Sequence, residues 1–451
     1  GRLGSQDVVS FTGSAETALR LRGAPEILAK STRFITEQDS LNASILGPDA
    51  GPGSPEFDLF VREVVQEMTT KAGQKCTAIR RIFVPEAQVA AVLSALPATL
   101  AKAQPGDPRV PETAMGALVS PSQKSDVLDK AAQIGTEAEL VFGEPDGFAL
   151  PGELSEGAFL PPLLYHCADP DGADVVHGVE AFGPVSTVMG YRDLAHAIAL
   201  VNRGEGSLVA SVITEVAREV ALEAGAFHGR LYFNNRDSMA EATGHGAPLP
   251  HMVHGGPGRA GGGEEMGGIR GVMHYMQRTA IQGSPKIVSA ISQRWVPGAP
   301  EVRAQTHPFR KRFHDLEIGE TLHSDHREVT LQDIETFAQF TGDTFSANMD
   351  HDAAARNPFF PGRVAHGYLL LSFAAGLFVD PDEGPVLANT GLDTLRFLKP
   401  VEPGDRIHVR LSVKQKTPRN AEYGEVRWHV TIRNQAEEPV AEYELLTMNA
   451  Y

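Results

Sequence analysis

The sequence predicts two domains, the first of the α/β class and the second of the α+β class. In the first part, short apolar segments typical of buried strands alternate with amphipathic helices. In the last part, alternating strands follow one long apolar helix. The Pro-Gly-Ala-Pro segment at 297–300 separates the two patterns and has the composition of a linker. A chain of 451 residues is also longer than a single hydrophobic core usually supports.

A strand and the start of a helix are expected near the beginning of the chain. Residues 7–11 read Asp-Val-Val-Ser-Phe, which predicts a short buried strand, and Thr12, Gly13 and Ser14 then open a helix. A lone strand and turn rarely begin a domain. We therefore expect the chain to start inside one.

An amphipathic helix is expected from Glu56 to about Ala72. Its apolar residues recur at the spacing of one helical face, and they are Phe57, Phe60, Val61, Val64, Val65 and Met68. The segment 81–85 predicts a strand, and 86–100 predicts a second helix. These elements give the first part its α/β character.

The second part has a recognisable helix start at Thr330. Thr330 and Asp333 resemble a capping box, and the helix they open is expected to reach about Phe340. The apolar segment 364–379 predicts a buried helix that is about a turn too short to span a bilayer. Turns then separate three predicted strands, at 406–414, 425–433 and 440–448.

Composition and charge exclude several classes of function. The formal net charge of −17 argues against nonspecific binding to nucleic acids or anionic membranes, since both require a basic surface. Cys76 and Cys167 are the only cysteines, which are too few for a disulfide framework. The first residues lack the features of a signal peptide, and no metal-binding motif is present. A cytoplasmic protein without a metal is expected.

Cys76 and Glu37 are the first candidates for catalysis. An isolated cysteine is usually a small buried core residue, and that alternative stays open. Two features favour a reactive thiolate instead. Cys76 follows Lys75 and is flanked by polar residues, and Glu37 lies in a segment that can deliver a carboxylate to the same cleft.

A glycine-rich segment occupies residues 254–268, with eight glycines in fifteen positions. It fits neither a Walker pattern nor a Rossmann fingerprint. A mobile or tightly turned loop is favoured over a phosphate cradle.

Five motifs in this order resemble the aldehyde dehydrogenase family. They are Phe-Thr-Gly-Ser at 11–14, Glu37, Gly-Gln-Lys-Cys at 73–76, Glu-Ala-Phe-Gly-Pro-Val at 180–185 and the glycine-rich segment 254–268. Cys76 follows Glu37 by 39 residues, a separation that is also similar to that family. The resemblance implies that Cys76 attacks the aldehyde and that Glu37 activates the hydrolytic water.

The same resemblance implies a dinucleotide cofactor, NADP or NAD. Gly13 and Ser14 are expected to meet its pyrophosphate at a helix N-terminus. Glu180 and Phe182 are expected to position its nicotinamide end, with a solvated surface charge as the alternative for Glu180. The family also has an asparagine that holds the oxyanion and a lysine or similar residue that binds the adenosine ribose. Both positions precede the start of this chain. We therefore expect most of the dinucleotide-binding half to be missing.

The second part resembles hydratases of the MaoC type, which have the hot-dog fold. Residues 340–354 place Asp343 where the acid-base aspartate of that family stands, but Asn348 replaces the catalytic histidine five residues later. The segment 363–372 resembles the entry to the central helix, where the Gly367 amide is expected to polarise a thioester carbonyl. The segment 396–405 resembles the following strand and turn. An impaired hydratase is favoured over a fully active one. His351 and His366 are candidates to replace the proton carrier, but a structural role is favoured for each, in the case of His366 as part of the turn that enters the helix.

The resemblance divides the chain into four parts. Residues 1–40 are expected to be a remnant of the dinucleotide-binding domain, and 41–297 the catalytic domain and its tail. A linker is expected at 298–302 and the hot-dog domain at 303–451.

A fusion of these two domains resembles the bifunctional phenylacetate-degradation family of bacteria. That resemblance implies hydrolytic opening of an oxepin ring carried on CoA, followed by oxidation of the resulting semialdehyde. His254, Arg396 and Lys414 are candidates to guide the anionic CoA thioester. Two alternatives stay open: a dehydrogenase for another CoA-linked semialdehyde, and a hot-dog domain that only binds CoA. Hot-dog domains generally pair, so a homo-oligomer is expected.

Overall fold

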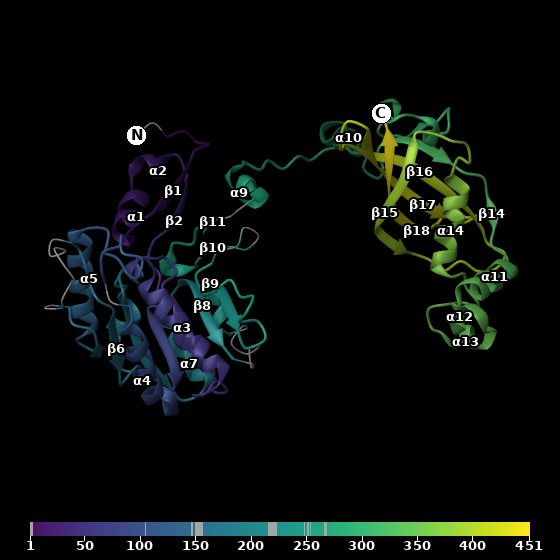
Figure 1. Cartoon of the computed structure of the whole chain (residues 1–451). Helices are drawn as coiled ribbons and strands as arrows, with labels where there is room; N and C mark the ends of the chain where they lie inside the picture. The colour runs from purple at the N-terminus through teal and green to yellow at the C-terminus, as the bar shows by residue number, and fades with distance from the viewer. Residues whose placement is uncertain are drawn as a thin grey trace. The chain divides into compact units, whose positions relative to one another are not determined.

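The computed structural model divides the chain into two compact units, Gly1–Arg278 and Thr279–Tyr451 (Figure 1). It describes residues 3–103, 105–145, 148, 157–214, 223–247, 249, 252, 254–265 and 268–451. Among these residues, no helix is long and apolar enough to cross a membrane. The two units are described separately.

The first unit is built on a seven-stranded sheet with the strand order β5-β6-β7-β4-β3-β8-β9. All neighbours in this sheet are parallel except β5 and β6. The strands are β3 (Ala43–Leu46), β4 (Arg81–Pro85), β5 (Glu139–Phe142), β6 (Leu163–Cys167), β7 (Val185–Tyr191), β8 (Ser207–Ile213) and β9 (His228–Asn234).

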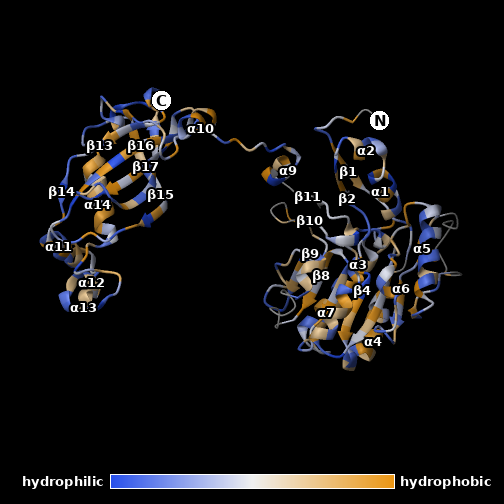
Figure 2. Ribbon diagram, turned by 180° about the vertical axis from the view of Figure 1, so that it is seen from behind, coloured by the Kyte–Doolittle hydropathy of each residue, from blue (hydrophilic) through white to orange (hydrophobic). Residues whose placement is uncertain are grey.

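Helices cover both faces of this sheet, and the side chains of each strand alternate between them. Ile82 and Val84 of β4 pack with α3 (Pro55–Thr69) and α4 (Val89–Leu100), whereas Phe83 faces the opposite core. That opposite core includes α5 (Pro121–Ile134) and α7 (Leu194–Asn202). Burial on both faces explains why these strands are nearly continuous apolar runs (Figure 2).

A separate two-stranded parallel sheet precedes the larger one. It consists of β1 (Val8–Thr12) and β2 (Arg33–Glu37), which α1 (Ala15–Arg22) and α2 (Pro25–Ala29) connect. A short antiparallel pair, β10 (His254–Gly255) and β11 (Glu264–Glu265), lies within the glycine-rich segment. The small sheet thus ends at the candidate base, Glu37.

The second unit contains another seven-stranded sheet, with the order β12-β13-β16-β17-β18-β15 and β14 paired to β16. Helix α14 (Gly367–Phe378) packs into its core through Leu369, Leu370, Ala374 and Phe378. The strands are β12 (Val302–Arg303), β13 (Glu320–His323), β14 (Arg327–Glu328), β15 (Val386–Phe397), β16 (Arg406–Pro418), β17 (Tyr423–Arg433) and β18 (Pro439–Ala450). The predicted α+β plan is therefore confirmed.

Local predictions in the second unit agree with the structure at the capping box. Helix α11 (Leu331–Thr341) begins after Thr330, whose hydroxyl accepts a bond from the Asp333 amide, while the Asp333 carboxylate accepts one from the Thr330 amide. Strand β15 was not predicted. Its sequence contains Asn, Gly and Asp, and pairing with β18 along its length fixes it as a strand.

The predicted linker at 298–302 lies inside the second unit, and the change of unit comes about twenty residues earlier. Helix α10 (Pro285–Ser292) and Trp295 precede the predicted linker. The Trp295 side chain is buried, and its backbone amide donates to the Lys414 carbonyl of β16. Val302 then pairs with β13. Tertiary contacts of an apolar side chain, not the composition of the turn, set this boundary.

Candidate active site

Cys76 lies in a tight loop that begins where helix α3 ends. The predicted helix to Ala72 stops at Thr69, because Lys71 and Ala72 adopt left-handed backbone angles, with φ of 55° and 53°. Gly73 continues with a φ of 67°, and a Cβ there would lie 2.2 Å from the Gly183 carbonyl oxygen. Only glycine tolerates this combination of angle and contact.

Side chains from three directions hold the backbone of the Cys76 loop. The Asn42 amide nitrogen donates to the Cys76 carbonyl at 2.7 Å, and His245 Nε2 donates to the Thr77 carbonyl at 2.9 Å. An Arg80 guanidinium nitrogen donates to the Gly73 carbonyl at 3.0 Å. These bonds fix the loop, so the thiol leaves it in one defined direction.

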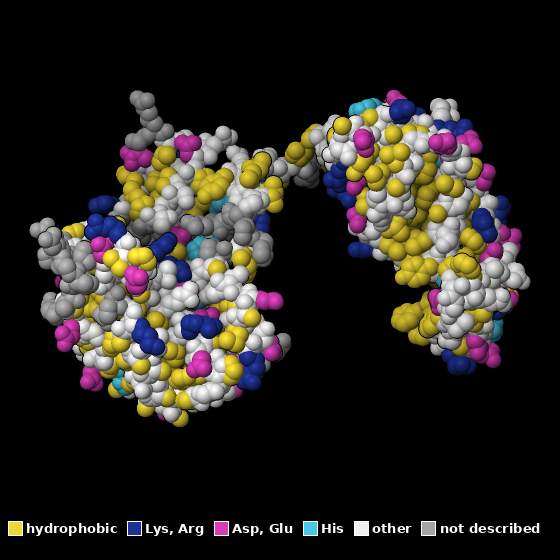
Figure 3. Space-filling view, in the orientation of Figure 1, with side chains coloured by type: hydrophobic (Ala, Val, Ile, Leu, Met, Phe, Trp, Pro, Cys, Tyr) yellow, Lys and Arg dark blue, Asp and Glu magenta, His cyan; other side chains and the backbone are white. Residues whose placement is uncertain are grey.

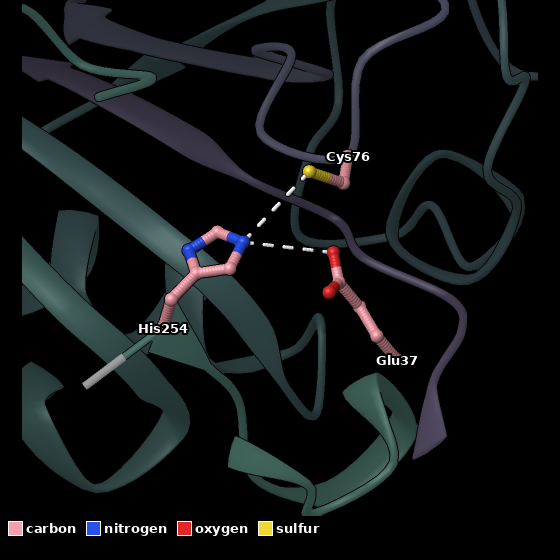
Figure 4. Close-up of side chains that lie close together, drawn as sticks. All are labelled: Glu37, Cys76 and His254. Atoms are coloured by element: carbon pink, nitrogen blue, oxygen red, sulfur yellow. Dashed lines mark hydrogen bonds and ion pairs between the residues drawn. The ribbon is translucent and has the colours of Figure 1, made fainter. Parts of the chain in front are cut away.

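Glu37 and His254 lie beside the Cys76 thiol (Figure 4). His254 Nε2 is 3.9 Å from Cys76 Sγ and 3.6 Å from a Glu37 carboxylate oxygen. The predicted proximity of Cys76 and Glu37 therefore agrees with the geometry, since their sulfur and oxygen atoms lie within 4.8 Å of each other. The predicted role of His254 as a surface guide for CoA does not agree with it, because its side chain is only 10% exposed and lies between the other two.

The glycine-rich segment forms tight turns packed against the end of β2. Gly261 has a φ of 102°, and a Cβ on Gly261 or Gly263 would lie within 2.5 Å of Thr36 oxygen atoms. A Cβ on Gly229 would lie 1.6 Å from the Gly255 carbonyl oxygen. The glycines thus allow the His254 strand to approach both β2 and β9, which explains how this loop reaches Glu37.

Glu180 and Phe182 are linked to the Cys76 loop through a buried guanidinium, that of Arg80. Arg80 Nε lies 3.4 Å from a Glu180 oxygen, and its guanidinium carbon lies 5.4 Å from the Phe182 ring centroid. The other Glu180 oxygen accepts the Ser40 amide at 3.1 Å. Burial raises the pKa of Glu180, while Arg80 opposes that shift. A carboxylate held in this way is not a solvated surface charge.

Gly13 and Ser14 stand at the start of α1, as predicted. The Gly13 amide donates to the Glu37 carbonyl at 3.1 Å, and the Ser14 hydroxyl caps the helix by accepting the Thr17 amide at 3.3 Å. The helix N-terminus therefore lies next to the strand that ends at Glu37. This is the carboxyl edge of the small parallel sheet, where α/β proteins bind ligands.

A polar cavity of about 260 Å³ lies on the other side of Lys75. Glu63 and Glu67 of α3 line it, and each has one buried carboxylate oxygen without a hydrogen bond among the described residues. Lys75 Nζ donates to Glu67 at 2.7 Å, and the Asn234 amide donates to Glu63 at 3.1 Å. Burial raises the pKa of Glu63 to about 7. The sequence did not predict this cavity, because nothing in the spacing of α3 indicates a carboxylate that points inward.

Glu63→Gln is expected to stabilise the first unit more at pH 8 than at pH 5. The pKa of Glu63 rises from 4.5 to about 7 on folding, so folding favours its protonated form. The stabilising contribution of protonated Glu63 to the free energy of unfolding is fully present below pH 4.5 and is lost as the pH rises through about 7. The substitution should therefore raise the free energy of unfolding by about 2–3 kcal/mol more at pH 8 than at pH 5.

Calorimetric unfolding of the first unit at both pH values measures this difference. Glu56→Gln on the same helix is the control, and its effect on stability should have the opposite sign. Hydrogen bonds from Arg236 lower the pKa of Glu56 to about 2, so the ionised carboxylate stabilises the fold. That variant should lose stability at both pH values. Equal effects of Glu63→Gln at pH 5 and pH 8 contradict the assignment.

The second unit places its candidate residues around the start of α14. Asp343 is exposed just after α11, and its backbone carbonyl accepts a bond from His366 Nε2 at 2.9 Å. Asn348 is buried, and its amide nitrogen donates to the Val364 carbonyl at 2.7 Å. Gly367 is the first residue of α14, and a Cβ there would lie 2.5 Å from the Phe397 ring. Asn348 therefore has a structural bond of its own.

Arg396 and Lys414, two residues predicted to guide the CoA thioester, differ in their surroundings. Arg396 is exposed on β15. The Lys414 side chain is only 13% exposed, and its ammonium pairs with Glu444, a carboxylate that Arg427 also contacts. His351 is exposed and pairs with Asp352, away from the buried Asn348 side chain.

These features define the class of protein. Residues 5–281 match the aldehyde dehydrogenase family, and residues 314–434 match the MaoC like domain. The chain belongs to the aldehyde dehydrogenase family and carries a MaoC-like domain after the dehydrogenase part.

Two curated proteins are similar to large parts of this chain. Protein MaoC of Klebsiella aerogenes is 51% identical over 309 residues, which cover 67% of this chain and 90% of that protein. The 3,4-dehydroadipyl-CoA semialdehyde dehydrogenase of Aromatoleum evansii is 45% identical over 255 residues, which cover 56% of this chain and 50% of that enzyme.

Among solved structures, betaine aldehyde dehydrogenase of Staphylococcus aureus matches with a TM-score of 0.52 and 25% identity. The match covers 60% of this chain and 52% of that one. The chain thus spans about half the length of this enzyme and of the Aromatoleum relative. The predicted fold of each domain is confirmed.

Proposed function

We propose that the dehydrogenase part oxidises a CoA-linked semialdehyde to the corresponding acid. The observation that carries the proposal is the close approach of Cys76 and Glu37, with His254 between them. A relative with 45% identity is named for its action on 3,4-dehydroadipyl-CoA semialdehyde. The substrate class of that relative supports a CoA thioester carrying an aldehyde.

The residues supply a two-stage reaction. The Cys76 thiolate attacks the aldehyde carbon, forming a thiohemiacetal, and loss of hydride from that carbon leaves a thioester. Glu37 then removes a proton from water, which attacks the thioester carbonyl and releases the acid and the free thiolate. His254 Nε2 faces both groups, so it can hold a proton between them.

A nicotinamide dinucleotide, NADP or NAD, supplies the hydride acceptor when bound. The residues present fit this group: the α1 N-terminus with Gly13 and Ser14 favours an anionic phosphate. Glu180 is held by Arg80 and the Ser40 amide, beside the Cys76 loop, where it can bind ribose hydroxyls. A solved relative is in complex with NAD+, which supports this cofactor class.

For the MaoC-like domain we propose hydrolytic opening of an oxepin ring carried on CoA, as in the phenylacetate-degradation family. Water adds to the ring carbon conjugated with the thioester, and the resulting hemiacetal opens to the aldehyde that the dehydrogenase part consumes. Asp343 would exchange the proton, and the Gly367 amide at the start of α14 would polarise the carbonyl. Asn348 favours the second candidate, a domain that binds CoA without catalysis, because its amide cannot transfer a proton near pH 7.

A homo-oligomer formed through β15 is also proposed. This strand ends the sheet order of its unit, and a free strand edge can pair with another chain. Its exposed side chains include Leu387, Leu392 and Phe397, and Figure 3 shows hydrophobic side chains gathered on this unit. Pairing of two copies would cover this apolar surface.

Glu37→Gln in the full-length protein is expected to give one burst of reduced cofactor without turnover. Glutamine keeps the shape of the side chain but cannot accept the proton of water, so the thioester on Cys76 persists. Rapid mixing with aldehyde and cofactor measures the burst, and mass spectrometry detects the acylated Cys76. Glu26→Gln, which changes an exposed carboxylate of α2, is the matched control and should keep steady turnover. Steady turnover by Glu37→Gln would rule out its role as base.

A further inference from the structure

The three side chains of the active-site cleft form a ligand set for a metal ion. Cys76, Glu37 and His254 come from the loop after α3, the end of β2 and β10, respectively. Their sulfur, oxygen and nitrogen atoms all lie within 4.8 Å of one another (Figure 4). Nothing in the linear spacing of these residues indicates a metal motif, since His254 lies 178 residues from Cys76.

The distances are close to those of a tetrahedral zinc site. Zinc bonds of about 2.3 Å to sulfur and about 2.0 Å to nitrogen or oxygen separate the ligand atoms by about 3.3–3.5 Å. Cys76 Sγ and His254 Nε2 are 3.9 Å apart, and His254 Nε2 and the Glu37 oxygen are 3.6 Å apart. Shifts of a few tenths of an ångström therefore bring these two pairs to coordination distance. The third pair, Cys76 Sγ and the Glu37 oxygen, lies within 4.8 Å.

The backbones that carry the three ligands are already held in place. Asn42 bonds the Cys76 carbonyl, and the Gly13 amide bonds the Glu37 carbonyl. His254 pairs with β11, and its neighbour Gly255 packs against Gly229. Only side-chain rotations are needed for closure, which keeps the conformational cost of binding low.

We propose that Cys76, Glu37 and His254 bind a thiophilic divalent cation such as Zn²⁺, in a site that blocks the nucleophile. The thiol loses its proton to solvent and a sulfur–metal bond forms, with no change in oxidation state. Three protein ligands leave a fourth position for water. The blocking effect rests on the proposed dehydrogenase function, whereas binding of the metal does not.

Thiolate coordination distinguishes this site from the other candidate cation group among the described residues. His326, His408 and Glu437 in the second unit also lie close together, but that group contains no sulfur. The second cysteine, Cys167, is buried in β6 at 1% exposure. A sulfur-to-metal charge-transfer band therefore reports on Cys76 alone.

Titration of the 451-residue chain with Co²⁺ under reducing, metal-free conditions tests the proposal. We expect a near-ultraviolet sulfur-to-cobalt band that saturates at one equivalent and is bleached when Zn²⁺ replaces Co²⁺. Cys76→Ser should abolish the band. His254→Phe and the polar His254→Gln should each weaken cobalt affinity by about 100-fold or more, since a ligand matters at least as much as its supporting shell.

His326→Ala is the matched control, because it removes a histidine from the sulfur-free group and should leave the band unchanged. Circular dichroism verifies that each variant folds. No band in the folded wild-type chain, or an undiminished affinity in both folded His254 variants, overturns the proposal. In the full-length protein, Zn²⁺ should inhibit aldehyde oxidation, and a chelator should restore it. A cobalt band in the 451-residue chain together with no aldehyde oxidation by the full-length protein would reject only the proposed function.

Discussion

Cys76→Ala abolishes aldehyde oxidation in the full-length protein, with an expected loss on the order of 10⁴-fold or more. The alanine side chain offers no atom that can form the covalent intermediate, and the other cysteine of the sequence, Cys167, lies buried in β6. Steady-state production of reduced cofactor measures the loss.

The fold should survive this substitution. The contacts that position the Cys76 loop are made by backbone carbonyls, to which Asn42 and Arg80 donate, and alanine retains them. The stability change should stay within about 1 kcal/mol. Cys167→Ala is the matched control: it removes a buried thiol from the core, so it should cost stability and leave oxidation intact. Oxidation by the Cys76→Ala protein at the wild-type rate would exclude Cys76 as the nucleophile.

Asn348→His raises hydration or ring opening by the MaoC-like domain, by roughly 10²–10⁴-fold, if Asp343 and Gly367 face the thioester. The geometry favours the substitution. Asn348 donates through its amide nitrogen to the Val364 carbonyl, and histidine Nδ1 occupies an equivalent position on its side chain. A histidine that makes this bond through Nδ1 leaves Nε2 available as a proton carrier.

Rates with an enoyl-CoA and with the oxepin-CoA substrate measure this gain. Asp343→Asn in the same background should remove it, whereas His351→Ala should not, because His351 is exposed and paired with Asp352. If the natural protein is already fast and Asn348→His changes nothing, another group carries the proton. His366 is then the first to test, since its buried Nδ1 has no hydrogen bond among the described residues. Binding of CoA esters without activity in either protein establishes the non-catalytic candidate.

Much of the fold follows from local patterns. The strand predicted at 81–85 is β4, because a short apolar run bounded by a helix start has few alternatives. The capping box at Thr330 is local by nature, and it forms as predicted. The end of α3 was missed, because three residues with positive φ angles depend on the close approach of Gly73 to the Gly183 carbonyl. That contact joins segments far apart in the sequence.

The boundary between the two units also depends on tertiary contacts that local sequence does not predict. Proline and glycine at 297–300 have the composition of a linker, but β12 pairs with β13 directly after them. Trp295 fixes the preceding segment to the second unit by burying its ring there. Composition reports where a chain can turn, whereas burial of a large side chain determines to which core it belongs.

The sequence by itself determined which chemical groups this protein can use. The motifs around Cys76 and Glu37 are short and ordered, and they identify a thiol and a carboxylate without any knowledge of contacts. Only the tertiary structure decided what surrounds those groups. His254 enters between them because glycines at 255, 261 and 263 let its segment pack against β2 and β9. Arg80 reaches both Glu180 and the Cys76 loop because it is buried at the meeting point of those segments. Distances between residues far apart in a chain depend on packing, and no local pattern records them.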